Sequence, residues 1–115
     1  MTKLEQLRDI AARLEEATEG SRELSCCIAV VAPANAWPCT YPKYSESIDA
    51  ALGLVERTLP GWGIGIAIDV DAPRLCQCRL RQSTQDDHFE EDAPTAPLAI
   101  LRAWVAAMIA QEEGK

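Results

Sequence analysis

The sequence has 115 residues, of which 48% are hydrophobic, and this composition suits one globular domain and excludes wholesale disorder. Its net charge of −7 argues against binding to nucleic acid or to an anionic membrane surface. The charged N-terminal stretch MTKLEQLRDI lacks the apolar core of a signal peptide, so we expect an intracellular protein that keeps its 5 cysteines as thiols.

Two helices are predicted before residue 33. Thr2 and Glu5 form a capping box ahead of a narrow apolar stripe at helical spacing, and Gly20 suits the end of this helix. The stripe predicts core packing, with a short coiled-coil seam as the alternative. Ser21 caps the second helix and Pro33 ends it, although its run CCIAVVA also suits a buried strand.

Residues 33–44 (PANAWPCTYPKY) hold three prolines and three aromatic residues without a period, which predicts a loop. Its aromatic residues Trp37, Tyr41 and Tyr44 either fold back onto the core or form a candidate interaction surface, because Trp and Tyr dominate interface energetics. A third helix is predicted from Ser45 to Thr58, capped by Ser45 or Ser47. Its apolar face carries Ile48, Ala51, Leu52, Val55 and Leu59.

From Trp62 the period changes to two, with large apolar residues at even positions and small residues at odd ones. This predicts an antiparallel hairpin over about 62–82. We expect its core face to carry Ile64, Ile66, Cys76, Cys78 and Leu80. The glycines on the other face of the hairpin either allow another backbone to approach closely or are exposed to water.

The acidic segment 82–92 is predicted to be an exposed loop. Five of its side chains are potential ligands for a divalent cation: Asp86, Asp87, His88, Glu90 and Glu91. A solvated loop is the favoured interpretation, because the glycine that shapes a calcium loop is missing.

The last predicted helix opens with Thr95 as its N-cap and Pro97 in its first turn. Its segment 98–110 (LAILRAWVAAMIA) has Arg102 as its one polar residue, which predicts burial on most sides. The segment is shorter than the roughly 20 apolar residues that cross a bilayer. Since one hairpin and one helical stripe offer little cover, we expect a homodimer through residues 98–110.

The cysteines suggest a second kind of site. Cys26, Cys27, Cys76 and Cys78 could hold zinc, although the usual C-x-x-C spacing is absent and buried cysteine also packs as a small apolar residue. Cys39, in the predicted loop, is expected to be the most reactive thiol. No nucleophile, base and orienting group can be assembled from these residues, so we expect neither an enzyme nor a cofactor.

Several segments together resemble the phage ABA-sandwich domain family. They are Arg22-Glu23-Leu24, the run from Pro42 to Leu52, Gly61-Trp62, and Ala96-Pro97-Leu98-Ala99-Ile100, in that order along the chain. The resemblance implies a small protein of bacteriophages or prophages in which helices are layered on a small sheet, and it implies no particular biochemical activity. The cysteines and the Pro/Trp-rich loop are not part of that pattern.

The sequence therefore predicts a single α+β domain over residues 1–115, with about four helices layered on a small antiparallel sheet. The favoured function is that of a non-enzymatic phage accessory or structural protein, acting through protein–protein contacts in the host cytoplasm or the virion. The alternative is a small thiol or zinc protein, redox-responsive through Cys26, Cys27, Cys76 and Cys78.

Overall fold

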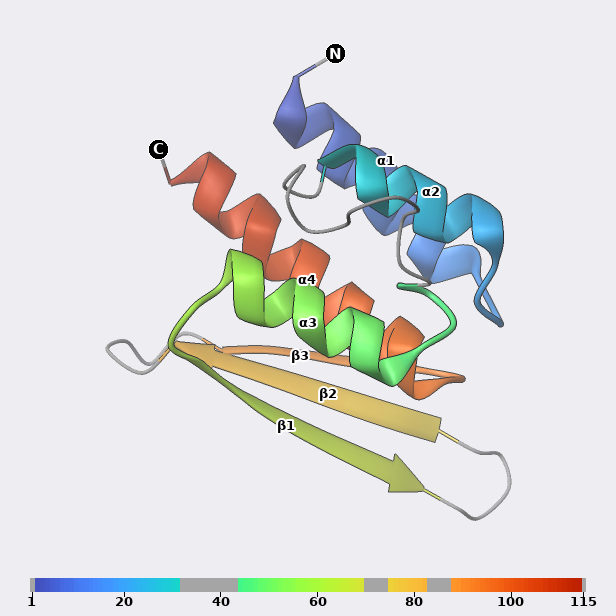
Figure 1. Ribbon diagram of the computed structural model, residues 1–115. Helices are drawn as coiled ribbons and strands as arrows, with labels where there is room; N and C mark the ends of the chain where they lie inside the picture. The colour runs from blue at the N-terminus through green and yellow to red at the C-terminus, as the bar shows by residue number, and fades with distance from the viewer. Residues whose placement is uncertain (1, 32–43, 70–74, 83–87, 115) are drawn as a thin grey trace.

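The computed structural model describes residues 2–31, 44–69, 75–82 and 88–114. The elements run in the order α1 (Lys3–Glu16), α2 (Arg22–Val31), α3 (Ile48–Thr58), β1 (Trp62–Asp69), β2 (Leu75–Gln82), β3 (His88–Ala93) and α4 (Ala96–Glu113). The strands form one antiparallel sheet in the order β1-β2-β3. Helices cover one face of this sheet, and no described helix or strand lies over the other (Figure 1). The predicted α+β fold is confirmed.

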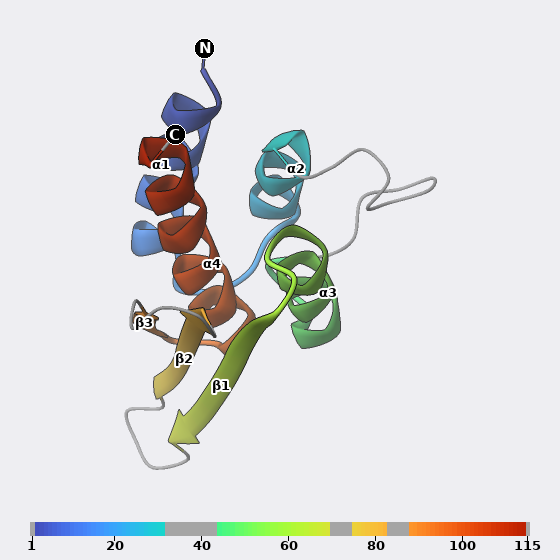
Figure 2. The ribbon, with the colours of Figure 1, turned by 90° about the vertical axis from the view of Figure 1, so that its left-hand side faces the viewer.

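Helix α4 lies at the centre of the molecule, over the sheet and between α1 and α3 (Figure 2). Most of its side chains are buried, and those of Leu101 and Trp104 are fully enclosed. The indole Nε1 of Trp104 donates a 2.8 Å hydrogen bond to Thr58 Oγ1 at the end of α3. One chain thus covers the apolar helix by itself. The argument for a homodimer through residues 98–110 was that this helix lacked cover, and α3 and the third strand supply that cover. The homodimer itself stays a prediction.

The third strand corrects the prediction of an exposed loop over residues 82–92. Strand β3 pairs with β2, placing Leu80 opposite Phe89 and Arg79 opposite Glu90. Phe89 and Ala93 lie on the face of the sheet that the helices cover, while Glu90 lies on the outer face. The alternation was hidden because acidic residues occupy positions on both faces of β3.

The predicted helices α1 and α2 are confirmed, whereas α3 begins three residues later than expected. Ser47 caps α3 by accepting a hydrogen bond from the backbone N–H of Ala50. Ser45 is instead buried, where its hydroxyl lies 2.9 Å from that of Ser25 and donates to the backbone carbonyl of Ser21. This serine cluster joins the start of α2 to the turn ahead of α3.

Gly20 does not end α1 as predicted, because the helix stops at Glu16 with Ala17 as its C-cap. A Cβ atom on Gly20 would collide with the backbone carbonyl of Ser45. The absence of a side chain therefore lets two backbone segments lie against each other beside the serine cluster.

The predicted hairpin is confirmed, with Ile64 opposite Leu80 and Ile66 opposite Cys78. Its burial differs from the expectation. Cys78 and Leu80 are fully buried under α4, whereas Ile66 in β1 keeps 38% of its surface exposed. The cause is the position of α4, which packs on β2 and β3 and meets β1 at few places. Ile66 belongs to the predicted face, but not to the core.

Candidate interaction surface

The outer edge of β1 is the first component of a candidate interaction surface. β1 pairs with β2 along its whole length, and no other described strand pairs with its second edge. An edge strand of this kind presents unpaired backbone N–H and C=O groups that can accept another strand. Natural edge strands are usually protected by charges or proline, and residues 62–68 contain neither.

A cluster of exposed isoleucines adjoins this edge. Ile48 at the start of α3 is 39% exposed, and Ile66 and Ile68 in β1 are 38% and 44% exposed. Ile48 and Ile68 line a groove of about 230 Å³ whose other walls are Cys76 and the segment Pro94–Pro97. Such a volume is smaller than the roughly 300 Å³ at which small-molecule pockets begin, so it suits single side chains of a partner. We call the β1 edge and these isoleucines the β1 surface.

The outer face of β1 is smooth. Gly63, Gly65 and Ala67 alternate with the isoleucines, and a shallow hollow lies over Gly65 and Ala67 beside Gln77 and Arg79 of β2. No long side chain of residues 62–68 stands on this face. The side chains of residues 62–68 therefore leave the outer face beside the β1 edge open to a second strand.

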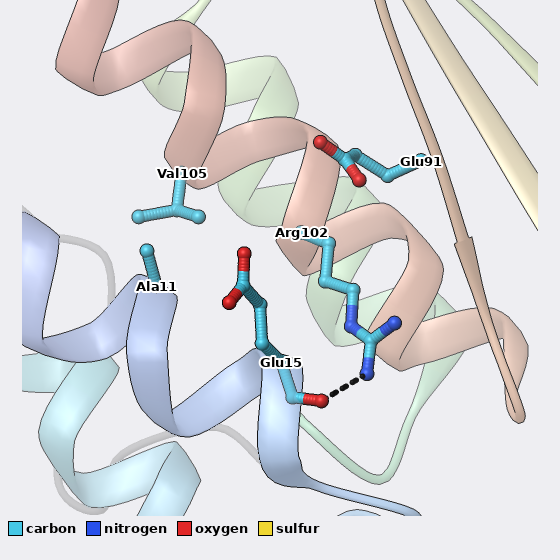
Figure 3. Close-up of a pocket in the computed structure, with 5 residues that line it drawn as sticks. All are labelled: Ala11, Glu15, Glu91, Arg102 and Val105. Atoms are coloured by element: carbon cyan, nitrogen blue, oxygen red, sulfur yellow. Dashed lines mark hydrogen bonds between the residues drawn. The ribbon is translucent and has the colours of Figure 1, made fainter.

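A second pocket surrounds Arg102, the polar residue of the α4 core segment (Figure 3). Its guanidinium donates hydrogen bonds to the backbone carbonyls of Leu14, Glu15 and Ala17 at 2.9–3.3 Å, and to that of Asp92 at 2.6 Å. The last carbonyls of a helix lack partners within the helix and carry partial negative charge. Arg102 thus caps the C-terminus of α1 and ties it to α4 and to the end of β3.

Two carboxylates accompany Arg102 in this pocket. Burial raises the pKa of Glu91, and the nearby Arg102 charge opposes this rise. The side chains of Glu15 and Glu91 lie on opposite sides of the arginine (Figure 3). The remaining lining residues are Ala11 and Val105, so no Ser, Thr, Cys, His or Lys side chain lines the pocket. The guanidinium of Arg102 is occupied by backbone carbonyls. We therefore interpret this pocket as the place where Arg102 holds α1, α4 and β3 together, and not as a ligand site.

The aromatic residues predicted to form an interaction surface are not all described. Trp37 and Tyr41 lie outside the described residues. Tyr44 is buried, with 1% of its surface exposed, and therefore belongs to the core. Its hydroxyl has no hydrogen-bond partner among the described residues, and burial raises the pKa of Tyr44.

The four cysteines of the zinc alternative are not brought together. Cys26 is exposed and Cys27 half-buried on α2, whereas Cys76 and Cys78 are buried in β2. Across the described part of the chain, no three His, Cys, Asp or Glu residues are placed to hold a metal ion. Burial also raises the pKa of Cys78 to about 11, which disfavours the thiolate that metals bind. Cys39 lies outside the described residues.

The side chains predicted to bind a divalent cation in the acidic segment are not brought together either. Asp86 and Asp87 lie outside the described residues. His88 and Glu90 are on the outer face of the sheet, whereas Glu91 points to the helix side, because neighbours in a strand face opposite ways. Glu90 pairs with Arg79 at 2.9 Å. These side chains therefore do not converge on one ion.

Sequence reasoning missed the β1 surface, because it assigned Ile48 and Ile66 to the core. The uncharged run Trp62–Ile68 could have indicated this surface. In a hairpin of two strands both strands have a free edge, and a free edge without charges can pair with another strand.

Within the described ranges, no helix is both long and apolar enough to cross a membrane. Searches of protein-family models, curated proteins and solved structures found no match to this chain. The resemblance to the phage ABA-sandwich family therefore stays a prediction.

Proposed function

We propose that this chain is a non-enzymatic protein that acts through protein–protein contacts, and that the β1 surface is where the contact forms. The observation that carries the proposal is an edge strand whose run Trp62–Ile68 has no charge, with Ile66 and Ile68 exposed on the strand and Ile48 exposed beside it. The resemblance to the phage ABA-sandwich family supports the further proposal that it is a small phage accessory or structural protein, located in the host cytoplasm or in the virion.

The two components of the β1 surface favour binding in different ways. Complete burial of an isoleucine is worth about 1.5–3 kcal/mol, so covering the exposed part of each residue contributes about 1 kcal/mol. The strand edge adds main-chain hydrogen bonds along its length, the mode by which many domains capture an extended segment. Together these terms favour a protein partner over a small molecule.

Site-specific photo-crosslinking in the cells that produce the protein tests this proposal. A photoreactive phenylalanine analogue replaces Ile68 in one variant and Ala12, an exposed residue of α1, in the control. We expect a discrete protein adduct, with another protein or with a second copy, from position 68 and none from position 12. Equal labelling at both positions, or no adduct at position 68, would contradict a binding role for the β1 surface.

A further inference from the structure

We propose that the occupant of the β1 edge is a second copy of this chain, paired strand to strand about a two-fold axis at Gly65. This inference rests on the proposed function and identifies its partner. Two three-stranded sheets joined through β1 become one six-stranded antiparallel sheet, with the helices of both copies on the same face.

The sequence of β1 is self-complementary about Gly65. In an antiparallel pair centred there, Trp62 lies opposite Ile68 of the second copy, Ile64 opposite its Ile66, and Gly63 opposite its Ala67. On the helix face Ile64 and Ile66 thus meet their counterparts in the second copy, and small residues meet small ones on the outer face. Cross-strand pairs of this kind are the unit that stabilises a sheet.

Charge favours the same arrangement. The chain carries a net charge of −7, so most contacts between two copies bring like charges together. The run Trp62–Ile68 has no charge, and the first acidic position beyond it, Asp69, falls opposite Gly61 of the second copy. The pairing therefore places no two carboxylates opposite each other.

A shift of the pairing by one residue removes this agreement. Such a shift turns the isoleucines of the second copy to the opposite face of the sheet, where they meet glycines. The two-fold at Gly65 instead joins the exposed Ile66 and Ile68 of both copies into one apolar strip beside Ile48. Trp62 does not obstruct this approach, because it stacks on Phe89 of β3 at 6.0 Å, away from the free edge.

The size of the contact sets its strength. Eight residues of strand span about 27 Å, and with a thickness of about 10 Å the footprint is roughly 270 Å² per copy. Standard protein interfaces bury about 800 Å² per partner. We therefore expect a weak dimer that forms with rising concentration.

Sedimentation equilibrium of the purified protein tests the pairing over about 5–500 µM, a range that brackets the micromolar dissociation constants of weak complexes. The mass of the wild type should rise from 12.6 kDa toward twice that value. The double variant Ile66→Lys, Ile68→Lys should stay at 12.6 kDa, since lysine on an edge strand opposes pairing. Ala12→Lys is the matched control and should follow the wild type. Circular dichroism verifies that both variants are folded.

A cysteine at position 65 tests the register. In the proposed dimer the two Gly65 Cα atoms lie about 4.5–5.5 Å apart, within reach of a disulfide. Gly65→Cys should form covalent dimers on mild oxidation, and Gly53→Cys on α3 should not exceed the wild-type background.

Two results would overturn the self-pairing. One is a wild-type mass of 12.6 kDa at every concentration, and the other is a lysine variant that dimerises as the wild type does. If the mass stays monomeric while position 68 crosslinks to a different protein, the proposed function stands and the second copy is excluded.

Discussion

At the residue scale, Gly20 allows the chain ahead of α2 to lie against the backbone of Ser45. A Cβ atom at this position meets a carbonyl group that cannot rotate away, as the end of a side chain could. We expect Gly20→Ala to lower the free energy of unfolding by about 1–3 kcal/mol, the usual cost of overpacking.

The matched control is Gly53→Ala in α3, where a Cβ atom would have no neighbour within 4 Å. That change should stabilise the protein by about 0.5–1 kcal/mol, since alanine loses less backbone entropy in a helix. Urea denaturation measures both variants. Effects of equal sign would disprove the assigned role of Gly20.

Glu91 is a second residue whose effect on stability depends on its surroundings, because burial changes its pKa. Burial raises its pKa above the ordinary 4.5, so the folded state binds this proton more tightly than the unfolded chain. Its contribution to stability is therefore fully present below pH 4.5 and is lost as the pH rises through the raised pKa.

Glu91→Gln removes this loss. The variant and the wild type should have similar Tm values at about pH 4, and the variant should melt higher at about pH 8. Thermal melts across this range measure the difference. A difference that shrinks toward high pH would mean that the attraction of Arg102 outweighs burial.

At the scale of the elements, Arg102 joins α4 to the neighbouring strand β3 and to α1, which is distant in sequence. It reaches from α4 to the last carbonyls of α1 and to the carbonyl of Asp92 in β3. We expect Arg102→Met to lower the free energy of unfolding by about 1.5–3 kcal/mol, because several carbonyls lose a charged donor at once.

Arg8→Met is the control, since Arg8 pairs with Glu113 through two exposed side chains. Exposed ion pairs contribute at most about 1 kcal/mol, so this variant should remain close to the wild type. Hydrogen exchange should also quicken at the end of α1 in the Arg102 variant alone. Unchanged exchange there would show that Arg102 does not cap the helix.

At the scale of the whole molecule, the described helices all lie on one face of the sheet. The helices meet on one side, where α4 gathers the core, and the outer face of the sheet has no described element over it. Because α4 lies over β2 and β3, the part of β1 that carries Ile66 and Ile68 projects beyond the covered region, whereas Trp62 and Ile64 pack against the core. The candidate interaction surface is therefore a consequence of how far the helical layer reaches across the sheet.

The sequence by itself determined the features that depend on neighbouring residues. Hydrophobic spacing and capping residues located all four helices to within a few residues, and the alternation from Trp62 established β1 and its pairing with β2. Such patterns are local, because a helix or strand repeats its faces every few residues.

Only the tertiary structure decided which apolar side chains are covered. Ile66 and Cys78 stand opposite each other in the hairpin, yet only Cys78 lies beneath α4. The same placement encloses Trp104 within one chain and leaves Ile48 and Ile68 exposed. Burial depends on where distant elements come to rest, and the periodicity of one segment carries no information about that position.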